Sequence, residues 1–263
     1  MKKCKSKIPF FATLGIMLLF YLPMLVVALD SFNPGRYSGS GWNGFSMRWY
    51  VKLVQDQDVI SALMNSLIIG LSATATAVVL GTLAAFAIHL YTDRVQKVHR
   101  LMIITQLGIP DILMGISLLL FFISLKLELG LFTIFLAHVT FCTSFVAMTV
   151  LARLQDFDFS TVEAARDLGA GWAIIIRRVI IPQIAPGIIA GALLAFTISI
   201  DDFVITYFVY GPGSTTLSVY IYSMMKHGTP VIINALSVIL IIVTFIMAYA
   251  INKLMSRKNE NIV

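Results

Sequence analysis

Long apolar stretches alternate with short polar segments along the whole chain of 263 residues. A membrane-spanning helix needs about 20 mostly apolar residues, and six stretches reach this length. They cover roughly residues 8–29, 62–91, 101–125, 131–152, 183–209 and 231–252. The pattern therefore predicts an all-α polytopic membrane protein with six transmembrane helices, in which one domain, residues 8–252, accounts for nearly the whole chain.

Composition and charge agree with this prediction and orient the chain. Hydrophobic residues make up 59% and charged residues 12%, whereas soluble domains carry about 25% charged residues. The chain has a net charge of +6, and most of its basic residues fall in alternate loops. By the positive-inside rule, these loops lie in the cytoplasm. We therefore expect the tails 1–7 and 253–263 and the loop 153–182 to be cytoplasmic. The basic residues on that side are Lys2, Lys3, Lys5, Lys7, Arg94, Lys97, Arg100, Arg153, Arg166, Arg177, Arg178, Lys253, Arg257 and Lys258.

The N-terminal lysines and the apolar run after them could form a cleavable signal peptide. That run is long, however, and its end lacks a good small-x-small cleavage site, so an uncleaved first span is expected. Cys4 is predicted to be cytoplasmic and Cys142 to lie within the fourth span, which argues against a disulfide between them.

The loop between the first two spans begins with turn-forming residues and ends in the aromatic and basic stretch 47–53. This stretch predicts a short helix at the outer membrane interface, where Trp49 and Tyr50 would act as anchors. Contact with an external delivery protein is the alternative. Small residues around Gly81 in the second span, and Gly187 with Gly191 in the fifth, predict close helix packing inside the bundle. The glycine pair could instead mediate dimerisation.

The polar segment between the fourth and fifth spans has helix signals of its own. Ser160 followed by Glu163 predicts a capping box, with a short helix beginning at about residue 161. Gly169 supplies a left-handed residue that would end this helix. A second helix is expected from about 172 to 180, with Pro182 marking the entry to the fifth span. Two such short helices form an elbow that needs a packing partner, either its own bundle or another protein.

Three carboxylates fall at membrane depth, where an ionisable side chain costs about 2.5–3.5 kcal/mol on insertion scales and usually marks a substrate or ion path. Asp111 follows Pro110 in the third span, where the proline and the flanking glycines can open the backbone. Asp201 and Asp202 lie towards the outer end of the fifth span. Since these segments hold no lysine or arginine, a cation is the natural ligand. Neighbouring helical residues point about 100° apart, so one of Asp201 and Asp202 should matter more. Helix capping and water binding are the structural alternatives for these acids.

Aromatic residues near Asp202, namely Tyr207, Phe208 and Tyr210, could add cation–π contacts, or could belong to an interface belt. His138 is expected to be packed or hydrogen-bonded rather than catalytic. The sequence contains no phosphate-binding G-x-x-x-x-G-K-[ST] loop, zinc signature or nucleophile elbow. We therefore expect a non-catalytic membrane subunit that binds no cofactor or metal itself.

The cytoplasmic segment resembles the EAA loop of ABC importer permeases. Glu163, Ala164, Ala165, Gly169 and Pro182 match the family spacing, while Val179 and Ile181 replace isoleucine and leucine. The resemblance implies the MetI-like fold of type I ABC importers, with cytoplasmic coupling helices and these five residues as the ATPase-coupling set.

The chain is also similar over nearly its full length to the PotC-type permeases of spermidine/putrescine ABC importers. The matching segments are Asp30-Ser-Phe-Asn, Arg48-Trp-Tyr, Pro110-Asp-Ile, His138-Val-Thr-Phe-Cys, Glu163-Ala-Ala-Arg-Asp-Leu-Gly-Ala and Ser199-Ile-Asp-Asp-Phe-Val. The resemblance implies polyamine import across a bacterial inner membrane, with Trp49, Asp111, Asp201 and Asp202 along the substrate path. It also implies a second, PotB-like permease, two copies of a PotA-like ATPase that holds ATP and Mg, and a PotD-like binding protein.

Two alternatives remain at this stage. Related permeases carry other cargoes, including iron and aminophosphonates. A secondary cation transporter would also suit six spans and buried acids, although a proton-driven carrier needs no EAA loop. A membrane-embedded enzyme is disfavoured because the sequence offers no set of nucleophile, base or metal ligands.

Overall fold

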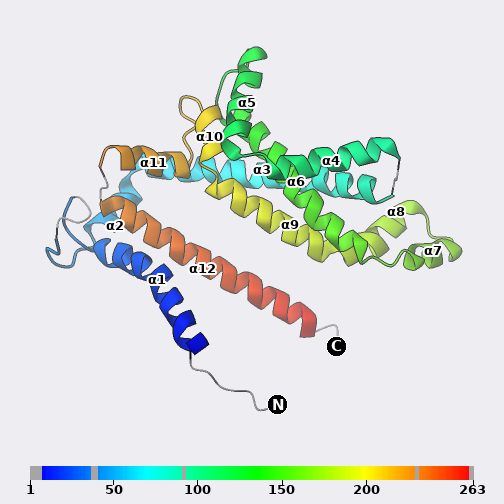
Figure 1. The fold of residues 1–263 in the computed structure, drawn as a ribbon, viewed down its shortest axis with the longest axis horizontal. Helices are drawn as coiled ribbons and strands as arrows, with labels where there is room; N and C mark the ends of the chain where they lie inside the picture. Colours follow the sequence, from blue (N-terminus) through cyan, green and yellow to red (C-terminus); the bar gives the residue numbers. More distant parts are fainter. Residues whose placement is uncertain (1–7, 37–40, 91–92, 229–230, 261–263) are drawn as a thin grey trace. The chain divides into compact units, whose positions relative to one another are not determined.

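The computed structural model describes residues 8–36, 41–90, 93–228 and 231–260, with side chains between residues 10 and 245. Every regular element of this described part is a helix (Figure 1). The chain divides into two compact units, Met1–Ile60 with Ile221–Val263, and Ser61–Tyr220. The basic side chains of both tails, and Cys4, lie outside the described residues.

The first unit contains α1 (Ile8–Asp30), α2 (Arg48–Gln55) and α12 (Val231–Glu260), and α12 packs against both other helices. Helix α1 matches the predicted first span, and its apolar side chains are exposed. Helix α2 confirms the short helix expected over 47–53. Within α12 the apolar part of the described side chains is Val231–Phe245.

The second unit is built around α6 (Leu131–Gln155) and α9 (Ile181–Asp201), which pack along each other. Helix α3 (Gln57–Leu90) lies close to α9 at Gly70 and close to α6 at Gly81. A Cβ atom at Gly187 would lie 2.7 Å from Cβ of Arg153, and one at Gly81 would lie 2.8 Å from Cβ of Val146. Helices can approach this closely only where a side chain is missing. The predicted packing of small residues inside the bundle is therefore confirmed.

The predicted third span is broken in two. Helix α4 (Arg94–Gly108) and helix α5 (Asp111–Ser124) meet at an angle of 113°. Ile109 has an extended backbone (ψ 129°), because proline disfavours a helical residue before it. The opening expected at Pro110 is confirmed, and residues 101–125 belong to a bent pair of helices instead of one straight helix.

The predicted fifth span, 183–209, differs in its bounds from the helix that the structure forms. Helix α8 (Trp172–Ile175) continues through the π-helical turn Ile176–Ile180 into α9 without a break at Pro182. A wider π turn tolerates a proline near its end, since Pro182 has no N–H to donate to the preceding turn. At the other end α9 stops at Asp201 and α10 (Val204–Val209) begins after an extended residue.

Two further helices complete the described part, α7 (Ser160–Asp167) and α11 (Leu217–Lys226). Within it, four helices are long and apolar enough to cross a membrane, or five if α4 and α5 count as one broken span. The all-helical membrane fold is thus confirmed, while the count of six spans is not.

Candidate functional site

The three acids that the sequence predicts at membrane depth line one cavity of about 360 Å³ in the second unit. Two helix breaks place them there. Pro110 ends the α4–α5 bend, so Asp111 becomes the first residue of α5, where a carboxylate is favoured by the helix dipole. Asp201 is the last residue of α9, and Asp202 forms the extended junction to α10. The other lining residues are Gln106, Leu107, Ile109, Met114, Phe141, Phe145, Ile198, Phe203, Val204 and Ile205.

The adjacent acids Asp201 and Asp202 have different environments. Asp201 is exposed, as is Asp111, whereas the Asp202 side chain is only 8% exposed. The Asp202 carboxylate accepts hydrogen bonds from the Thr206 N–H (2.8 Å) and hydroxyl (2.7 Å), and from the Ile205 N–H (3.3 Å). Asp111 and Asp201 can therefore contact a ligand, while Asp202 is occupied by the protein itself.

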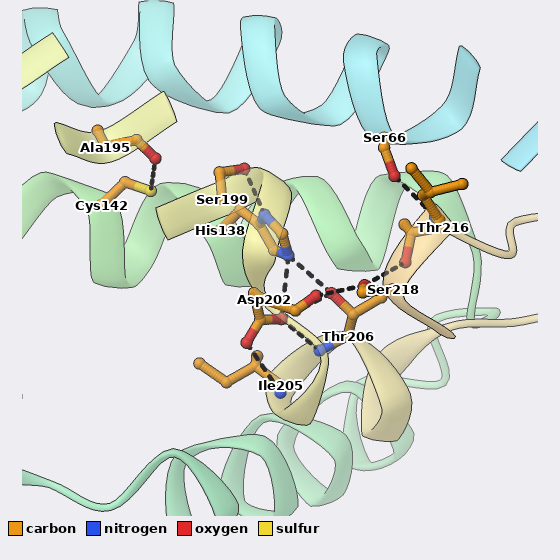
Figure 2. A network of polar contacts seen from close by, with 11 residues as sticks. Ser66, His138, Cys142, Ala195, Ser199, Asp202, Ile205, Thr206, Thr216 and Ser218 are labelled. Atoms are coloured by element: carbon orange, nitrogen blue, oxygen red, sulfur yellow. Dashed lines mark hydrogen bonds and ion pairs between the residues drawn. The ribbon is translucent and has the colours of Figure 1, made fainter. Parts of the chain in front are cut away.

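A buried histidine completes the surroundings of Asp202 (Figure 2). His138 from α6 has Nδ1 2.7 Å from Ser199 Oγ and Nε2 2.9 Å from Thr206 Oγ1. Its Nε2 also lies 3.5 Å from Asp202 Oδ2. The expectation that His138 is hydrogen-bonded is confirmed. The sequence alone did not identify Ser199 and Thr206 as the partners of His138. Polar residues in separate apolar helices are, however, a signal for hydrogen bonds between those helices.

The cavity is strongly biased in charge. Among the described residues that line it are three carboxylates and neither lysine nor arginine. Low-dielectric walls strengthen the attraction of these carboxylates for a cation. Its aromatic lining consists of Phe141, Phe145 and Phe203.

The aromatic residues expected from the sequence lie outside this lining. Tyr207 and Tyr210 contact each other, with ring centroids 6.0 Å apart. Phe208 packs on Gly115, where a Cβ atom would lie 2.6 Å from the Phe208 ring. None of these three residues therefore lines this cavity, and their alternative place in an interface belt stays a prediction.

Trp49 belongs to the first unit and is buried, with 5% of its side chain exposed. Its indole N–H donates to the Asn33 carbonyl oxygen (2.9 Å), and Asn33 in turn donates to the Gly41 carbonyl (2.6 Å) and to Asp30 (3.2 Å). Burial of an indole with its N–H satisfied is typical of a structural anchor. Trp49 thus holds the loop before α2, and its predicted place on a substrate path stays a prediction.

The elbow forms as expected at Gly169, which has φ +77°. The Gly169 N–H donates to the Arg166 carbonyl (2.8 Å), and the Ala170 N–H donates to the Ala165 carbonyl (3.0 Å). These two bonds define a Schellman motif at the end of α7.

The predicted capping box of Ser160 and Glu163 is wrong. Ser160 is already the first helical residue, and its N–H donates to the Asp158 carboxylate (2.9 Å). Asp158 therefore satisfies an N–H at the start of α7. The same hydrogen bond holds the pKa of the Asp158 carboxyl below its usual value.

The elbow has a packed side and an open side. Val162 and Ile175 are buried, whereas Glu163, Leu168 and Trp172 are exposed, Leu168 to 88%. The exposed Trp172 ring lies under the Arg166 guanidinium at 4.1 Å. Pro182 and Ala164 are exposed, and Ala165 is half-buried. An exposed leucine and tryptophan on a short, well-anchored helix pair are typical of a protein-binding surface.

The chain is similar in sequence to known transport permeases. Residues 77–257 match the family model described as "Binding-protein-dependent transport system inner membrane component". The spermidine/putrescine transport system permease protein PotC of Haemophilus influenzae is 37% identical over 241 residues, 92% of this chain and 93% of that protein. The putrescine transport system permease protein PotI of Escherichia coli K12 is 40% identical over 247 residues, 91% and 88% of the two chains.

Two solved structures share the fold. A chain of a bacterial ABC transporter that imports the acidic polysaccharide alginate superposes with a TM-score of 0.76 at 17% identity, covering 96% of this chain and 99% of that one. The MetNI methionine ABC transporter, in an inward-facing conformation, gives a TM-score of 0.61 at 18% identity, covering 80% and 97%. At such identities the likeness concerns the fold alone, and it confirms the predicted fold class.

Proposed function

Because the chain belongs to the family of binding-protein-dependent transport system inner membrane components, we propose that it forms half of the translocation pathway of an ATP-driven polyamine importer. As a member of this family it is a permease subunit of an ABC transporter and not an enzyme. The proposal concerns its cargo, its pathway residues and its partners.

One observation carries the choice of cargo. Asp111 and Asp201, from two helix breaks far apart in the sequence, line the same cavity and are exposed to it. Spermidine and putrescine are flexible chains that carry several ammonium groups at neutral pH. Each ammonium group gains a charge-assisted hydrogen bond to a carboxylate, and these bonds are stronger than neutral ones. Spermidine and putrescine are also the cargoes in the names of PotC and PotI.

The elbow supports the proposed energy source. Its exposed side, with Glu163, Leu168 and Trp172, is the surface on which an ATPase subunit would dock. The Schellman motif at Gly169 fixes the angle between α7 and α8. Because α8 continues into α9 without a break at Pro182, a force on the elbow would pass directly to the helix that ends at Asp201.

The partners follow from this assignment. A PotB-like permease would supply the other half of the pathway, two PotA-like subunits would hold ATP and Mg at the elbows, and a PotD-like protein would deliver the polyamine. Both termini and the elbow would lie in the cytoplasm, as the positive-inside rule predicts. ATP binding would draw the two elbows together and open the cavity outwards to the loaded binding protein.

Other functions fit the observations less well. Aminophosphonates carry a negative phosphonate group, which a cavity with three carboxylates disfavours. Iron as a cation would suit the charge. A secondary carrier would explain the acids but leaves the exposed elbow without a role.

Neutral variants of the acids test the cargo. Asp111→Asn and Asp201→Asn preserve size and remove the charge, so each should lower spermidine and putrescine uptake by about tenfold or more, the size of one charge-assisted hydrogen bond. Uptake of labelled polyamine into cells that express the whole complex is the measurement. Asp93→Asn is the matched control, because Asp93 is exposed and makes no side-chain bond at the start of α4.

Folding is not expected to suffer, since a costly charge leaves the membrane region. Wild-type uptake of both polyamines together with unchanged uptake in both variants would refute the cation site. Failure of the wild-type complex to take up any polyamine would refute the choice of cargo instead.

A further inference from the structure

The break between α9 and α10 needs internal partners. An interrupted helix leaves backbone N–H and C=O groups without helical bonds, and at membrane depth these groups must be satisfied by the protein. The Asp202 carboxylate accepts the N–H groups of Ile205 and Thr206. The Ser218 hydroxyl donates to the Asp202 carbonyl oxygen (2.7 Å). Specific side-chain hydrogen bonds therefore stabilise the break, which is not a frayed helix end.

His138 contacts both sides of this break (Figure 2). It reaches Ser199 in the last turn of α9, Thr206 in α10 and the carboxylate of Asp202 between them. His138 is 1% exposed and Thr206 is fully buried. One side chain of α6 thus joins the two helices on either side of the junction.

The hydrogen bonds among His138, Thr206 and Asp202 have a defined direction. The Thr206 hydroxyl donates its single proton to Asp202 Oδ2, so its oxygen is left to accept from Nε2 of His138. Nε2 therefore carries a proton that points towards Thr206 and Asp202. The imidazole accompanies the Thr206 hydroxyl and places its N–H dipole beside the buried Asp202 carboxylate, in addition to the three hydrogen bonds which that carboxylate accepts.

We propose that His138 is a positioning residue for the cation cavity. It fixes the α9–α10 junction so that Asp201 stays on the cavity wall, and it holds Asp202 in the protein's own hydrogen-bond network. This inference rests on the proposed function only in that the cavity binds the cargo. A histidine that merely filled space would be replaceable by any side chain of similar size, and its loss would not be compensated by a change of charge elsewhere.

The test measures the polyamine taken up per ATP hydrolysed by the complete complex in proteoliposomes. His138→Asn leaves the Asp202 carboxylate without its full partner set, so this ratio should fall about tenfold. A variant that only lowered the amount of folded complex would reduce uptake and ATP hydrolysis in proportion and leave the ratio unchanged. An unchanged ratio in His138→Asn would overturn the proposal.

Compensation gives the second readout. In His138→Asn combined with Asp202→Asn, no buried charge remains, and an amide can still accept the Thr206 N–H. The ratio in the double variant should return to within about threefold of wild type, because contacting residues couple strongly. A double variant as impaired as His138→Asn, or more so, would overturn the proposal. If His138→Asn alone does not assemble, the double variant should still assemble and transport.

Thr140→Ala is the matched control on the same helix. Thr140 is exposed and its hydroxyl bonds only the Leu136 carbonyl of its own turn. The ratio of polyamine taken up to ATP hydrolysed in Thr140→Ala should equal that of wild type. A similar fall in Thr140→Ala would mean that the effect is not specific to His138.

A readout without cargo separates this inference from the proposed function. Asp201→Cys is made with Cys4→Ser, and the rate of its modification by a charged thiol reagent is measured. Cys142 is buried and should not react. Adding His138→Asn should change the rate by about fivefold or more if Asp201 moves, and an unchanged rate would overturn the positioning role even in a complex that transports another cargo.

Discussion

Gly169 allows the elbow to be tested by a change of backbone preference alone. It has φ +77°, and a Cβ atom built there would have nothing within 4 Å. A Cβ atom therefore meets no neighbour, and the main cost of a side chain at this position is the left-handed conformation. For an L-residue this cost is about 1–2 kcal/mol, and a β-branched side chain lies at the upper end.

That cost acts on two hydrogen bonds. The left-handed turn lets the N–H groups of Gly169 and Ala170 reach the carbonyl groups of Arg166 and Ala165. If valine adopts φ below zero instead, both bonds open and the angle between α7 and α8 changes. A penalty of 2 kcal/mol reduces the fraction of correctly bent elbows by about thirtyfold.

The assay is copurification of the ATPase subunit with the tagged chain, followed by polyamine uptake. Gly169→Val should lower both together while the chain still inserts into the membrane. Gly169→Asn should keep most of the activity, because asparagine tolerates the left-handed region. Gly171→Ala is the matched control, since Gly171 lies in the same elbow with open space around it but has φ −72°.

The need for a left-handed residue at position 169 is refuted if Gly169→Val binds the ATPase and transports as well as Gly171→Ala does. Loss of activity in both variants would also refute it, because the defect would then not depend on backbone sign.

The energy source of transport and the helix packing at Gly187 can each be tested. Transport should stop when the partner ATPase is inactivated and continue when the proton gradient is collapsed with ATP maintained; uptake that ends with the gradient while ATP stays high would contradict the ABC assignment. Gly187→Ala should destabilise the chain in detergent by about 1–3 kcal/mol, since the new Cβ would meet Cβ of Arg153 at 2.7 Å, whereas Gly108→Ala, with nothing within 4 Å, should leave its thermal unfolding unchanged.

Features that depend on local backbone chemistry were predictable from the sequence. Proline disfavours a helical residue before it, and this located the α4–α5 bend at Pro110. Glycine alone adopts a positive φ without cost, and this located the elbow at Gly169. Small residues at helical spacing marked the faces around Gly81 and Gly187, because lipid gives helices little other reason to carry them.

Features that depend on a choice between equivalent local solutions were not predictable. Pro182 could end one helix and begin another, or be absorbed by a π turn, and the helix adopts the second solution. Ser160 could cap α7, but the Asp158 carboxylate two residues earlier takes the N–H instead. In both cases the residue types permit either outcome, so local rules alone do not choose between them.

Asp201 and Asp202 illustrate this limit most clearly. Two identical residues at adjacent positions have the same propensity and hydropathy, so these two measures cannot assign one to the cavity and the other to the protein. The difference comes from the local hydrogen bonds that Asp202 accepts from Ile205 and Thr206, and from His138, which meets Ser199, 61 residues away, only in the folded chain. Once that contact exists, Asp202 is committed to the junction and Asp201, as the last residue of α9, is the carboxylate left exposed. Local hydrogen bonds and a contact that no sequence window contains therefore determine together which acid can bind a cation.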